Sequence, residues 1–417
     1  MNEAIENLKA RGFFAQCSSV DGLSRLMSDE PVTFYIGIDP TASSAHIGHM
    51  VPFFALKHLV NSGHKGIALM GAGTARIGDP SFRSETRQIL TYEQLDKNAD
   101  AILAQLDHFV GFDGKNTITA NNKDWLAGLN YIDFLRDIGI HFSVNRMLSM
   151  EAYKVRLETG LSFIEFNYQL LQSYDYLELY RRHGCRLQIG GDDQWGNILS
   201  GVDLIRRIEG TEVFALTFPL VTTADGNKMG KTLKGALFLD PSITTPYEFF
   251  QYWRNVQDAD IRKFLLMFTF LPIDEIDVIT AAGKNPNEAK ERLAWEITAL
   301  IHGSGEADKA MAGARAAFSG GAGGDKSAMP SAGLSRARFE AGYNVIDLFC
   351  DAGLAASKSE GRRLVEQGGA FVSAPGTSAE LSAISNVTAV IGVENLDGEG
   401  ELVLRAGKKR YCLVRTS

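Results

Sequence analysis

Two histidines follow a short apolar segment near the N-terminus, and their spacing is typical of a phosphate-binding turn. Residues 32–38 read V-T-F-Y-I-G-I, a β-branched and aromatic run that predicts a buried strand. The letters D-P-T then break this strand, and a helical pattern begins at H-I-G-H. His46 and His49 lie three residues apart, so they share one face of the first helical turn. Unpaired backbone N–H groups and the helix dipole attract phosphate at such a position.

Small residues around the histidines refine this prediction. Ser43 and Ser44 are the candidates to cap the helix. Gly48 leaves space for a flat base or a ribose to approach the backbone. A histidine pair alone is also typical of a core helix. The order of strand, D-P-T turn and histidine pair is more specific, and it favours a nucleotide site.

Further strands must position this turn. Strand, helix and strand alternate at a spacing that predicts an α/β fold with a Rossmann-like, doubly wound parallel sheet. Ligands of such sheets bind beyond the carboxyl ends of the strands. Asp39 and Asp79 each follow a predicted strand, so we expect both to point into one crevice. The expected strands are residues 32–38, 66–70, 116–120, 186–189 and 213–222.

A helix predicted over residues 163–183 carries three polar side chains on one stripe. Tyr168, Gln172 and Asp175 have the spacing i, i+4 and i+7. Buried polar groups need partners, so these side chains either satisfy one another or line a polar pocket. The next strand ends in G-G-D-D-Q-W-G-N, where glycines admit a ligand close to the polar side chains.

A cationic loop follows the last predicted strand of the sheet. The letters T-A-D-G-N-K-M-G-K-T place Lys228, Lys231 and Thr232 in a glycine-containing loop. A solvated lysine hairpin is the alternative interpretation of this pattern.

Composition excludes several classes of protein. The chain has 417 residues and a net charge of −8, so any RNA contact needs local basic patches, and we expect no DNA partner. The 4 cysteines are widely spaced, without a zinc-binding or disulfide pattern, which favours a reducing, cytoplasmic setting. No apolar run has the length of a membrane span.

The chain is expected to form several domains. Its apolar segment at 121–165 carries residues that look exposed, Trp125 among them, and it is either a subunit interface or a packed internal helix. The predicted parts are a first domain at 1–230 containing that insertion, a helical domain at 231–318, a flexible linker at 319–335, and a small α+β domain at 336–417.

Basic residues gather in two clusters of the last domain. It has ten basic and ten acidic residues, and eight of the ten basic residues lie within 357–363 and 405–415. Such clustering in a neutral domain favours a face that contacts a nucleic-acid backbone, and ordinary surface charge is the alternative. The candidate RNA-binding residues are Lys358, Arg362, Arg363, Lys408, Lys409 and Arg410.

Several separate motifs together resemble one family. Y-I-G-I-D-P-T-A, I-G-D-P-S, Y-Q-L-L-Q-S-Y-D, R-L-Q-I-G-G-D-D-Q-W-G-N and K-M-G-K-T resemble bacterial-type tyrosyl-tRNA synthetases, which are class I aminoacyl-tRNA synthetases. The resemblance runs from about Phe34 to Trp253, and D-A-G-L-A-A-S-K-S-E-G-R-R-L-V resembles the family's small RNA-binding domain. It implies a homodimer that activates tyrosine with ATP, accompanied by Mg²⁺, and charges tRNA(Tyr). It also implies that 1–230 is the catalytic domain, that 231–318 lies on the anticodon side of the tRNA, and that 336–417 binds RNA. It implies no permanent cofactor, and we see no protein cage for a metal.

The resemblance also implies roles for single residues. The catalytic residues would be Thr41, His46, His49, Lys228, Lys231 and Thr232. ATP would contact Gly37, Asp39, His46, Gly48, His49, Gly191, Asp193 and Lys231. Tyrosine would be held by Tyr35 and Asp175 at its hydroxyl, by Asp79, Tyr168 and Gln172 at its ammonium group, and by Gln194 near its carboxylate.

Two residues depart from the general pattern. Gly230 stands where the wider class has serine, and Asp192 stands where the family usually has a small serine. The alternatives are a tryptophanyl-type synthetase and a non-catalytic RNA-binding protein on a synthetase scaffold. The RNA-binding tail and the Tyr35–Asp175 pair argue against the first, and the intact histidines and lysines argue against the second.

Overall fold

The structure is a computed structural model of the chain. It describes residues 1–79, 90–150, 153–154, 157–158, 160–226, 229, 231–232, 235–318, 331–374, 381–407 and 410–416. By compactness the chain divides into one unit of residues 1–244 with 256–289, and another of 245–255 with 290–417. This division differs from the expected boundary after residue 230. Within the described part, no helix is long and apolar enough to cross a membrane.

A six-stranded sheet forms the centre of the first unit, in the order β1-β6-β5-β2-β3-β4. Its strands are β1 (Gln16–Cys17), β2 (Thr33–Ile38), β3 (Lys65–Met70), β4 (Thr117–Asn121), β5 (Leu187–Gly191) and β6 (Phe214–Phe218). The five strands from β2 to β6 pair in parallel, and β1 pairs antiparallel with β6. The predicted doubly wound α/β fold is therefore confirmed, while the short strand β1 was not predicted.

The order of the strands places a topological switch point between β2 and β5. The chain runs outward from β2 through β3 to β4, then returns and runs outward from β5 to β6. At such a point the loops after the two central strands diverge and open a crevice. Tyr35 of β2 lies opposite Gln188 of β5 at this junction.

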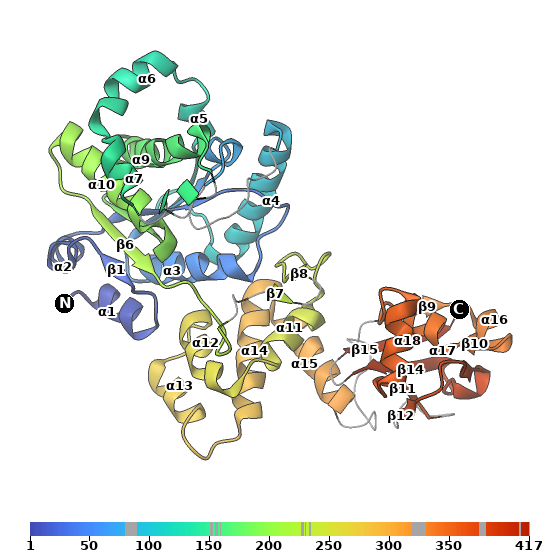
Figure 1. The fold of residues 1–417 in the computed structure, drawn as a ribbon. Helices are drawn as coiled ribbons and strands as arrows, with labels where there is room; N and C mark the ends of the chain where they lie inside the picture. Colours follow the sequence, from blue (N-terminus) through green and yellow to red (C-terminus); the bar gives the residue numbers. More distant parts are fainter. Residues whose placement is uncertain are drawn as a thin grey trace. The chain divides into compact units, whose positions relative to one another are not determined.

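Helices cover both faces of this sheet (Figure 1). α3 (Met50–Asn61) packs on β2 and β3, and α4 (Tyr92–Val110) packs beside α3. On the other face α9 (Phe163–His183) packs against α10 (Trp195–Glu209), which contacts β5 and β6. Alternation along the strands explains the arrangement, since Tyr35, Ile67 and Leu69 pack in one cluster with residues of α9 and α10.

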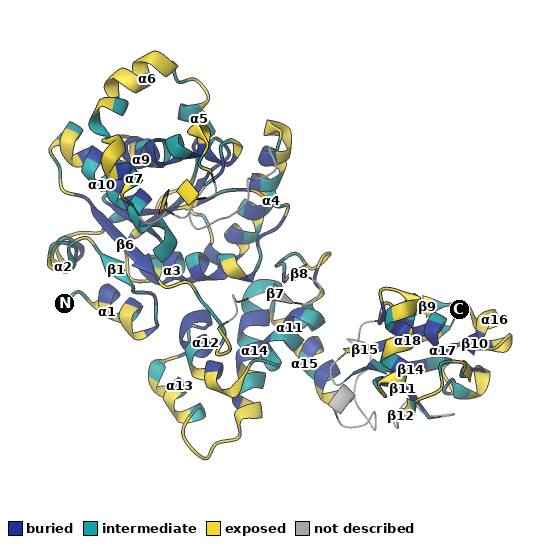
Figure 2. Ribbon diagram, viewed as in Figure 1, coloured by how far each residue is buried: buried dark blue, intermediate teal, exposed yellow. Residues whose placement is uncertain are grey.

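Shorter elements complete the first unit. They are α1 (Glu3–Ala10), α2 (Val20–Asp29), η1 (Ile47–His49), η2 (Thr74–Arg76), α5 (Lys123–Leu126), α6 (Tyr131–Asp137), η3 (Gly139–His141), α7 (Val144–Leu148), η4 (Asp192–Gln194), β7 (Lys231–Thr232), β8 (Gly235–Ala236), η5 (Asp258–Asp260), α12 (Ile261–Phe268) and α13 (Ile273–Ile279). Figure 2 shows the central strands buried and α6 largely exposed, and α6 contains no buried residue.

The second unit contains a helical part and a small sheet. The helices are α11 (Pro246–Arg254), α14 (Pro286–His302), which begins in the first unit, and α15 (Ser304–Phe318). The sheet has the order β12-β11-β14-β15-β9. Its strands are β9 (Ser331–Leu334), β11 (Ala370–Ser373), β12 (Leu381–Ile384), β14 (Glu401–Ala406) and β15 (Arg410–Thr416), and they are joined by α16 (Arg336–Glu340), β10 (Tyr343–Asn344), α17 (Val345–Asp351), α18 (Lys358–Glu366), β13 (Val390–Ile391) and η7 (Val393–Asn395).

One part of the linker prediction is wrong. Residues 331–334 form β9, which pairs in parallel with β15 at the edge of the small sheet. Four consecutive backbone pairs stabilise this short segment although its sequence, S-A-G-L, lacks strand-forming character. The remaining linker residues, 319–330, lie outside the described residues.

Candidate active site

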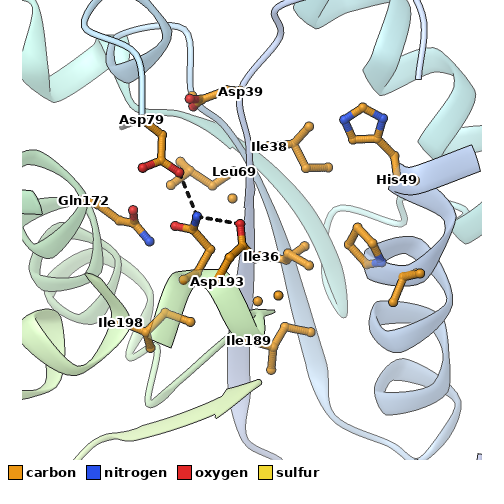
Figure 3. Close-up of a pocket in the computed structure, with 18 of the residues that line it drawn as sticks. Ile36, Ile38, Asp39, His49, Leu69, Asp79, Gln172, Ile189, Asp193 and Ile198 are labelled. Carbon is orange, nitrogen blue, oxygen red and sulfur yellow. Dashed lines mark hydrogen bonds between the residues drawn. The ribbon is translucent and has the colours of Figure 1, made fainter. Parts of the chain in front are cut away.

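A cavity of about 500 Å³ lies at the carboxyl ends of the parallel strands, at the switch point between β2 and β5. It brings together fourteen of the predicted site residues from five separate segments of the chain. They are Tyr35, Gly37, Asp39, Thr41, His46, Gly48, His49, Asp79, Tyr168, Gln172, Asp175, Gly191, Asp193 and Gln194. The expectation that Asp39 and Asp79 point into one crevice is confirmed (Figure 3).

The carboxylate of Asp175 is the most deeply buried charged group of this cavity, with 3% of the residue exposed. Asn122 Nδ2 donates to Asp175 Oδ2 at 2.9 Å, and Trp125 Nε1 donates to Oδ1 at 2.7 Å. Burial raises the pKa of Asp175 to about 7, although these two hydrogen bonds act to lower it. The carboxyl group therefore changes its charge near neutral pH.

The Tyr35 hydroxyl lies in the same polar region. Its ring packs against Tyr176 at 5.3 Å between centroids, and the residue is 1% exposed. Among the described residues, no group forms a hydrogen bond with this buried hydroxyl. Burial, with the charge of Asp175, raises the pKa of Tyr35 well above its ordinary value, so the phenol stays protonated. A donor and an acceptor thus line the same cavity, and together they suit a ligand group that can both accept and donate a hydrogen bond, as a hydroxyl does.

A second polar cluster lines the same cavity, and Figure 3 shows Asp79, Gln172 and Asp193 in it. Gln194 Nε2 donates to Asp79 Oδ2 at 2.7 Å and lies 3.3 Å from Asp193 Oδ2. The Tyr168 hydroxyl donates to Asp39 Oδ2 at 3.2 Å. Within the described residues, the buried Oε1 of Gln172 has no hydrogen-bond donor. Carboxylate and carboxamide oxygens at one end of a cavity suit a ligand ammonium group.

The two histidines form the start of the helical segment. His46 caps η1, with its Nδ1 accepting from Gly48 N at 3.0 Å, and His49 Nδ1 accepts from His46 N at 3.1 Å. The prediction that Ser43 or Ser44 caps this helix is therefore wrong. Gly48 is required here because an added Cβ would lie 2.7 Å from the His46 ring.

Backbone donors also determine the tautomer of both imidazoles. Burial lowers the pKa of His46, and burial followed by the neighbouring His46 lowers the pKa of His49 to about 3. Both rings are therefore neutral at pH 7. Because each Nδ1 accepts a backbone hydrogen bond, the proton of each ring is carried by Nε2. The pair supplies two neutral N–H donors to the cavity.

The lysine loop is joined to the histidine turn through the backbone. β7 pairs with β8, and residues directly after β8 pair with the turn: Ile47 N donates to Leu237 O at 3.0 Å, and Leu239 N donates to Ala45 O at 2.8 Å. Lys231 and Thr232 form β7, and only their backbone is described. Lys228 lies outside the described residues.

The candidate RNA-binding residues belong to the second unit. Lys358, Arg362 and Arg363 lie on α18 with exposed side chains, and Arg410 begins β15. Two of these cations have acidic neighbours: Lys358 Nζ is 2.8 Å from Asp347, and Arg410 is 3.6 Å from Glu360. Lys408 and Lys409 lie outside the described residues.

Sequence reasoning missed three residues that hold two carboxylates of the cavity, Asp175 and Asp39. Asn122 and Trp125 bond Asp175, and Thr74 Oγ1 donates to Asp39 Oδ1 at 3.0 Å. Trp125 was expected to be exposed, but it is buried, because its indole N–H reaches Asp175. A signal existed for Asn122, which directly follows β4 at the carboxyl edge of the sheet.

Comparisons with known proteins agree with this geometry. The family "tRNA synthetases class I (W and Y)" matches residues 27–319. A tyrosine–tRNA ligase of Treponema denticola is 60% identical over 414 residues, covering 99% of each chain, and one of Treponema pallidum is 56% identical, covering 100% of this chain and 99% of its own. A solved, C-terminally truncated mitochondrial tyrosyl-tRNA synthetase of Aspergillus nidulans matches with a TM-score of 0.69 at 31% identity, over 76% of this chain and 94% of its own.

The fold, the cavity and the family match define a class I tRNA synthetase. With relatives at 60% and 56% identity over nearly its whole length, the chain belongs within that class to the tyrosine–tRNA ligases.

The pKa of Asp175 leads to a prediction about tyrosine binding. A phenol hydroxyl that donates to Asp175 favours the ionised carboxylate, so binding releases a proton wherever the empty site is protonated. Because burial raises the pKa of Asp175 to about 7, the affinity for L-tyrosine should rise from pH 6 to pH 8, by no more than about tenfold per pH unit for one proton. Equilibrium dialysis across this range measures the affinity.

Proton release is the control for this prediction. Titration calorimetry in buffers of different ionisation enthalpy should show release at pH 6 and little at pH 8. The release should disappear in Asp175→Asn, which cannot titrate. An affinity that stays flat, or release that persists in Asp175→Asn, would contradict the role of this carboxyl group.

Proposed function

We propose that this cavity binds L-tyrosine together with MgATP and joins them as tyrosyl-adenylate. The chain is an ATP-dependent tyrosine–tRNA ligase, so tyrosine is first activated and is then transferred to the 3′ end of tRNA(Tyr). In activation, the tyrosine carboxylate attacks the α-phosphate and pyrophosphate leaves. The observation that carries this assignment is that three features line one cavity: buried Asp175, the Tyr35 hydroxyl, which has no hydrogen-bond partner among the described residues, and the two histidines.

The polar end of the cavity supports the choice of amino acid. Tyr35 and Asp175 bind the phenol hydroxyl as donor and acceptor, respectively. Phenylalanine would leave the Tyr35 hydroxyl unpaired and would give Asp175 no donor beyond Asn122 and Trp125. A buried polar group that loses its partner costs about 1–3 kcal/mol, and more when it is charged. Asp79, Tyr168 and Gln172 bind the ammonium group, and Gln194 lies near the carboxylate.

The histidine side supports a mechanism of positioning and charge stabilisation. No covalent intermediate with the enzyme is needed, because the bound carboxylate is itself the nucleophile. His46 and His49 offer Nε2–H donors to the phosphates, and Thr41 and His46 act at the γ-phosphate. Asp193 binds ribose hydroxyls, with Gly37, Asp39, Gly48 and Gly191 around the nucleotide.

The cationic loop completes the phosphate site in this proposal. Lys228, Lys231 and Thr232 stabilise the pyrophosphate as it leaves, and each such donor typically contributes about 3 kcal/mol to transition-state stabilisation. Mg²⁺ enters with ATP as part of the substrate. Among the described residues, no group of three or more His, Cys, Asp and Glu side chains could hold a metal ion.

The parts of the chain divide the work. We assign adenylate formation to residues 1–230, contacts on the anticodon side of the tRNA to the helices within 231–318, and RNA binding to 336–417, joined through 319–330. The exposed cations of α18 support the last assignment, because they can neutralise phosphates. The four free cysteines suit a reducing cytoplasm.

We also propose that the enzyme is a homodimer joined through the helical insertion at 121–165. Its exposed apolar side chains support an interface, with Ile132 68% and Ile140 75% exposed. Tyr131, Val144 and Leu157 add further exposed apolar surface.

Tyrosine-dependent exchange of pyrophosphate into ATP tests the central assignment. The exchange should proceed with tyrosine and Mg²⁺, scarcely with phenylalanine or tryptophan, and not after chelation of Mg²⁺. Lys231→Ala should lower the rate with little change in tyrosine affinity, because the loop acts on the leaving group. Equal rates with tyrosine and phenylalanine would reject the pocket, and an unchanged rate in Lys231→Ala would remove the loop from the mechanism.

The proposed RNA contact of α18 predicts that tRNA charging can be lost while pyrophosphate exchange is kept. Replacing Arg362 and Arg363 together by Ala should reduce tRNA charging several-fold and make it less sensitive to salt, with pyrophosphate exchange unchanged. Arg338→Ala is the matched control, because this arginine of the same domain is paired with Asp351. Full charging by the double variant would exclude α18 from the tRNA interface.

The dimer proposal predicts a change in mass. Sedimentation equilibrium should give twice the chain mass for the wild type and a shift toward the monomer for Ile140→Asp, since a buried charge disrupts an apolar interface. Val278→Asp is the control, because this side chain is 61% exposed and lies outside the insertion. A monomeric wild type, or a dimer unaffected by Ile140→Asp, would contradict the proposed interface.

A further inference from the structure

Helix α4 carries two carboxamide side chains that face the loop between β2 and the first histidine. Asn98 and Gln105 are seven residues apart, which is close to two helical turns, so they lie on the same face of α4. Both residues are half-buried. Neither has a role in the site described above.

These two side chains bond opposite ends of that loop. Asn98 Nδ2 donates to Pro40 O at 3.0 Å, directly after β2. Gln105 Oε1 accepts from Ala45 N at 2.9 Å, directly before His46, and Gln105 Nε2 donates to Ser44 Oγ at 3.0 Å. Ser44 and Ala45 are fully buried, so the second contact is shielded from water.

The loop carries groups that face the cavity but belongs to no helix or strand. Thr41 and Ala42 line the cavity, and His46 follows at the end of the loop. A backbone segment without a regular ladder takes its position from other hydrogen bonds. Here the side chains of a long, regular helix supply bonds at both ends, which places the loop relative to α4.

Ser44, the partner of Gln105, also contacts the segment that follows β8. Ser44 Oγ, which accepts from Gln105, also accepts from Asp240 N at 3.2 Å. Leu239 N donates to the carbonyl of Ala45 at 2.8 Å. The carboxamide of Gln105 therefore holds Ser44 and Ala45, the residues through which the start of the histidine turn pairs with the segment after β8.

We propose that Asn98 and Gln105 are positioning residues for adenylate formation. They hold the loop so that Thr41 and His46 meet the phosphates of ATP in the geometry of the transition state. They do not contact the substrate, and they act through the loop backbone. This inference rests on the proposed function of the cavity, to which it adds two residues outside the cavity wall.

The test compares Gln105→Met with Gln105→Glu in the full-length enzyme. Gln105→Met keeps the length of the side chain and removes both hydrogen bonds, so kcat for tyrosine-dependent pyrophosphate exchange should fall by at least about tenfold. The KM for tyrosine should change less than twofold, because Tyr35 and Asp175 are unaffected. Gln105→Glu keeps an acceptor for Ala45 N and should restore part of kcat.

A double-mutant cycle tests whether the two carboxamides act as one clamp. Asn98→Leu alone should lower kcat in the same direction. If both residues hold one loop, Asn98→Leu combined with Gln105→Met should cost less than the product of the two single effects. Effects that simply multiply would overturn the shared clamp.

Lys57→Met is the matched control for a general loss of packing. Lys57 Nζ donates to Val110 O of α4 at 2.6 Å, and it does not contact the loop. Its loss should lower stability with kcat nearly unchanged. The inference is overturned if Gln105→Met exchanges at the wild-type rate, if its KM for tyrosine rises as much as its kcat falls, or if Lys57→Met loses as much kcat at equal stability. A wild type without tyrosine-dependent exchange would instead reject the proposed function itself.

Discussion

The rest of the site depends on one constraint, which is that the buried carboxylate of Asp175 needs hydrogen-bond donors around it. Asp175 lies on α9 with its oxygens held by Asn122 and Trp125, and burial still raises its pKa to about 7. A charged group in such a position is costly unless it is hydrogen-bonded on several sides. Asn122 and Trp125, at the start of the helical segment after β4, are therefore held close to α9 by their hydrogen bonds to Asp175.

The same hydrogen bonds continue across the cavity. Asn122 also donates to Thr74, Thr74 donates to Asp39, and Asp39 accepts from Tyr168, which returns to α9. Each member is held by another, so the polar end of the cavity is prepared before a ligand arrives. Gly71 belongs to this arrangement because a Cβ at its position would overlap the Asp39 carboxylate.

Two groups of residues lie together at the switch point between β2 and β5, one from the sheet and α9 and the other from the histidine turn. In the proposed function, side chains of the sheet and α9 bind the amino acid and the histidine turn binds the phosphates. Backbone N–H groups of this turn donate to Nδ1 of both imidazoles, which leaves Nε2 as the donor. The histidine turn also pairs through its backbone with the segment that directly follows β8. The proposed amino-acid and phosphate sites are adjacent because the topology brings the ends of parallel strands to one edge.

The sequence by itself determined the doubly wound sheet, the bounds of α9 and most of the polar side chains of the cavity, because alternation, helical periodicity and strand-end polar residues are local signals. It did not reveal Trp125 as a partner of Asp175, His46 rather than a serine as the cap, or residues 331–334 as a strand. Only the tertiary structure decided these points. Each of the three points depends on a hydrogen-bond partner distant in sequence or on the orientation of a ring. The spacing of residues in the sequence predicts neither of these.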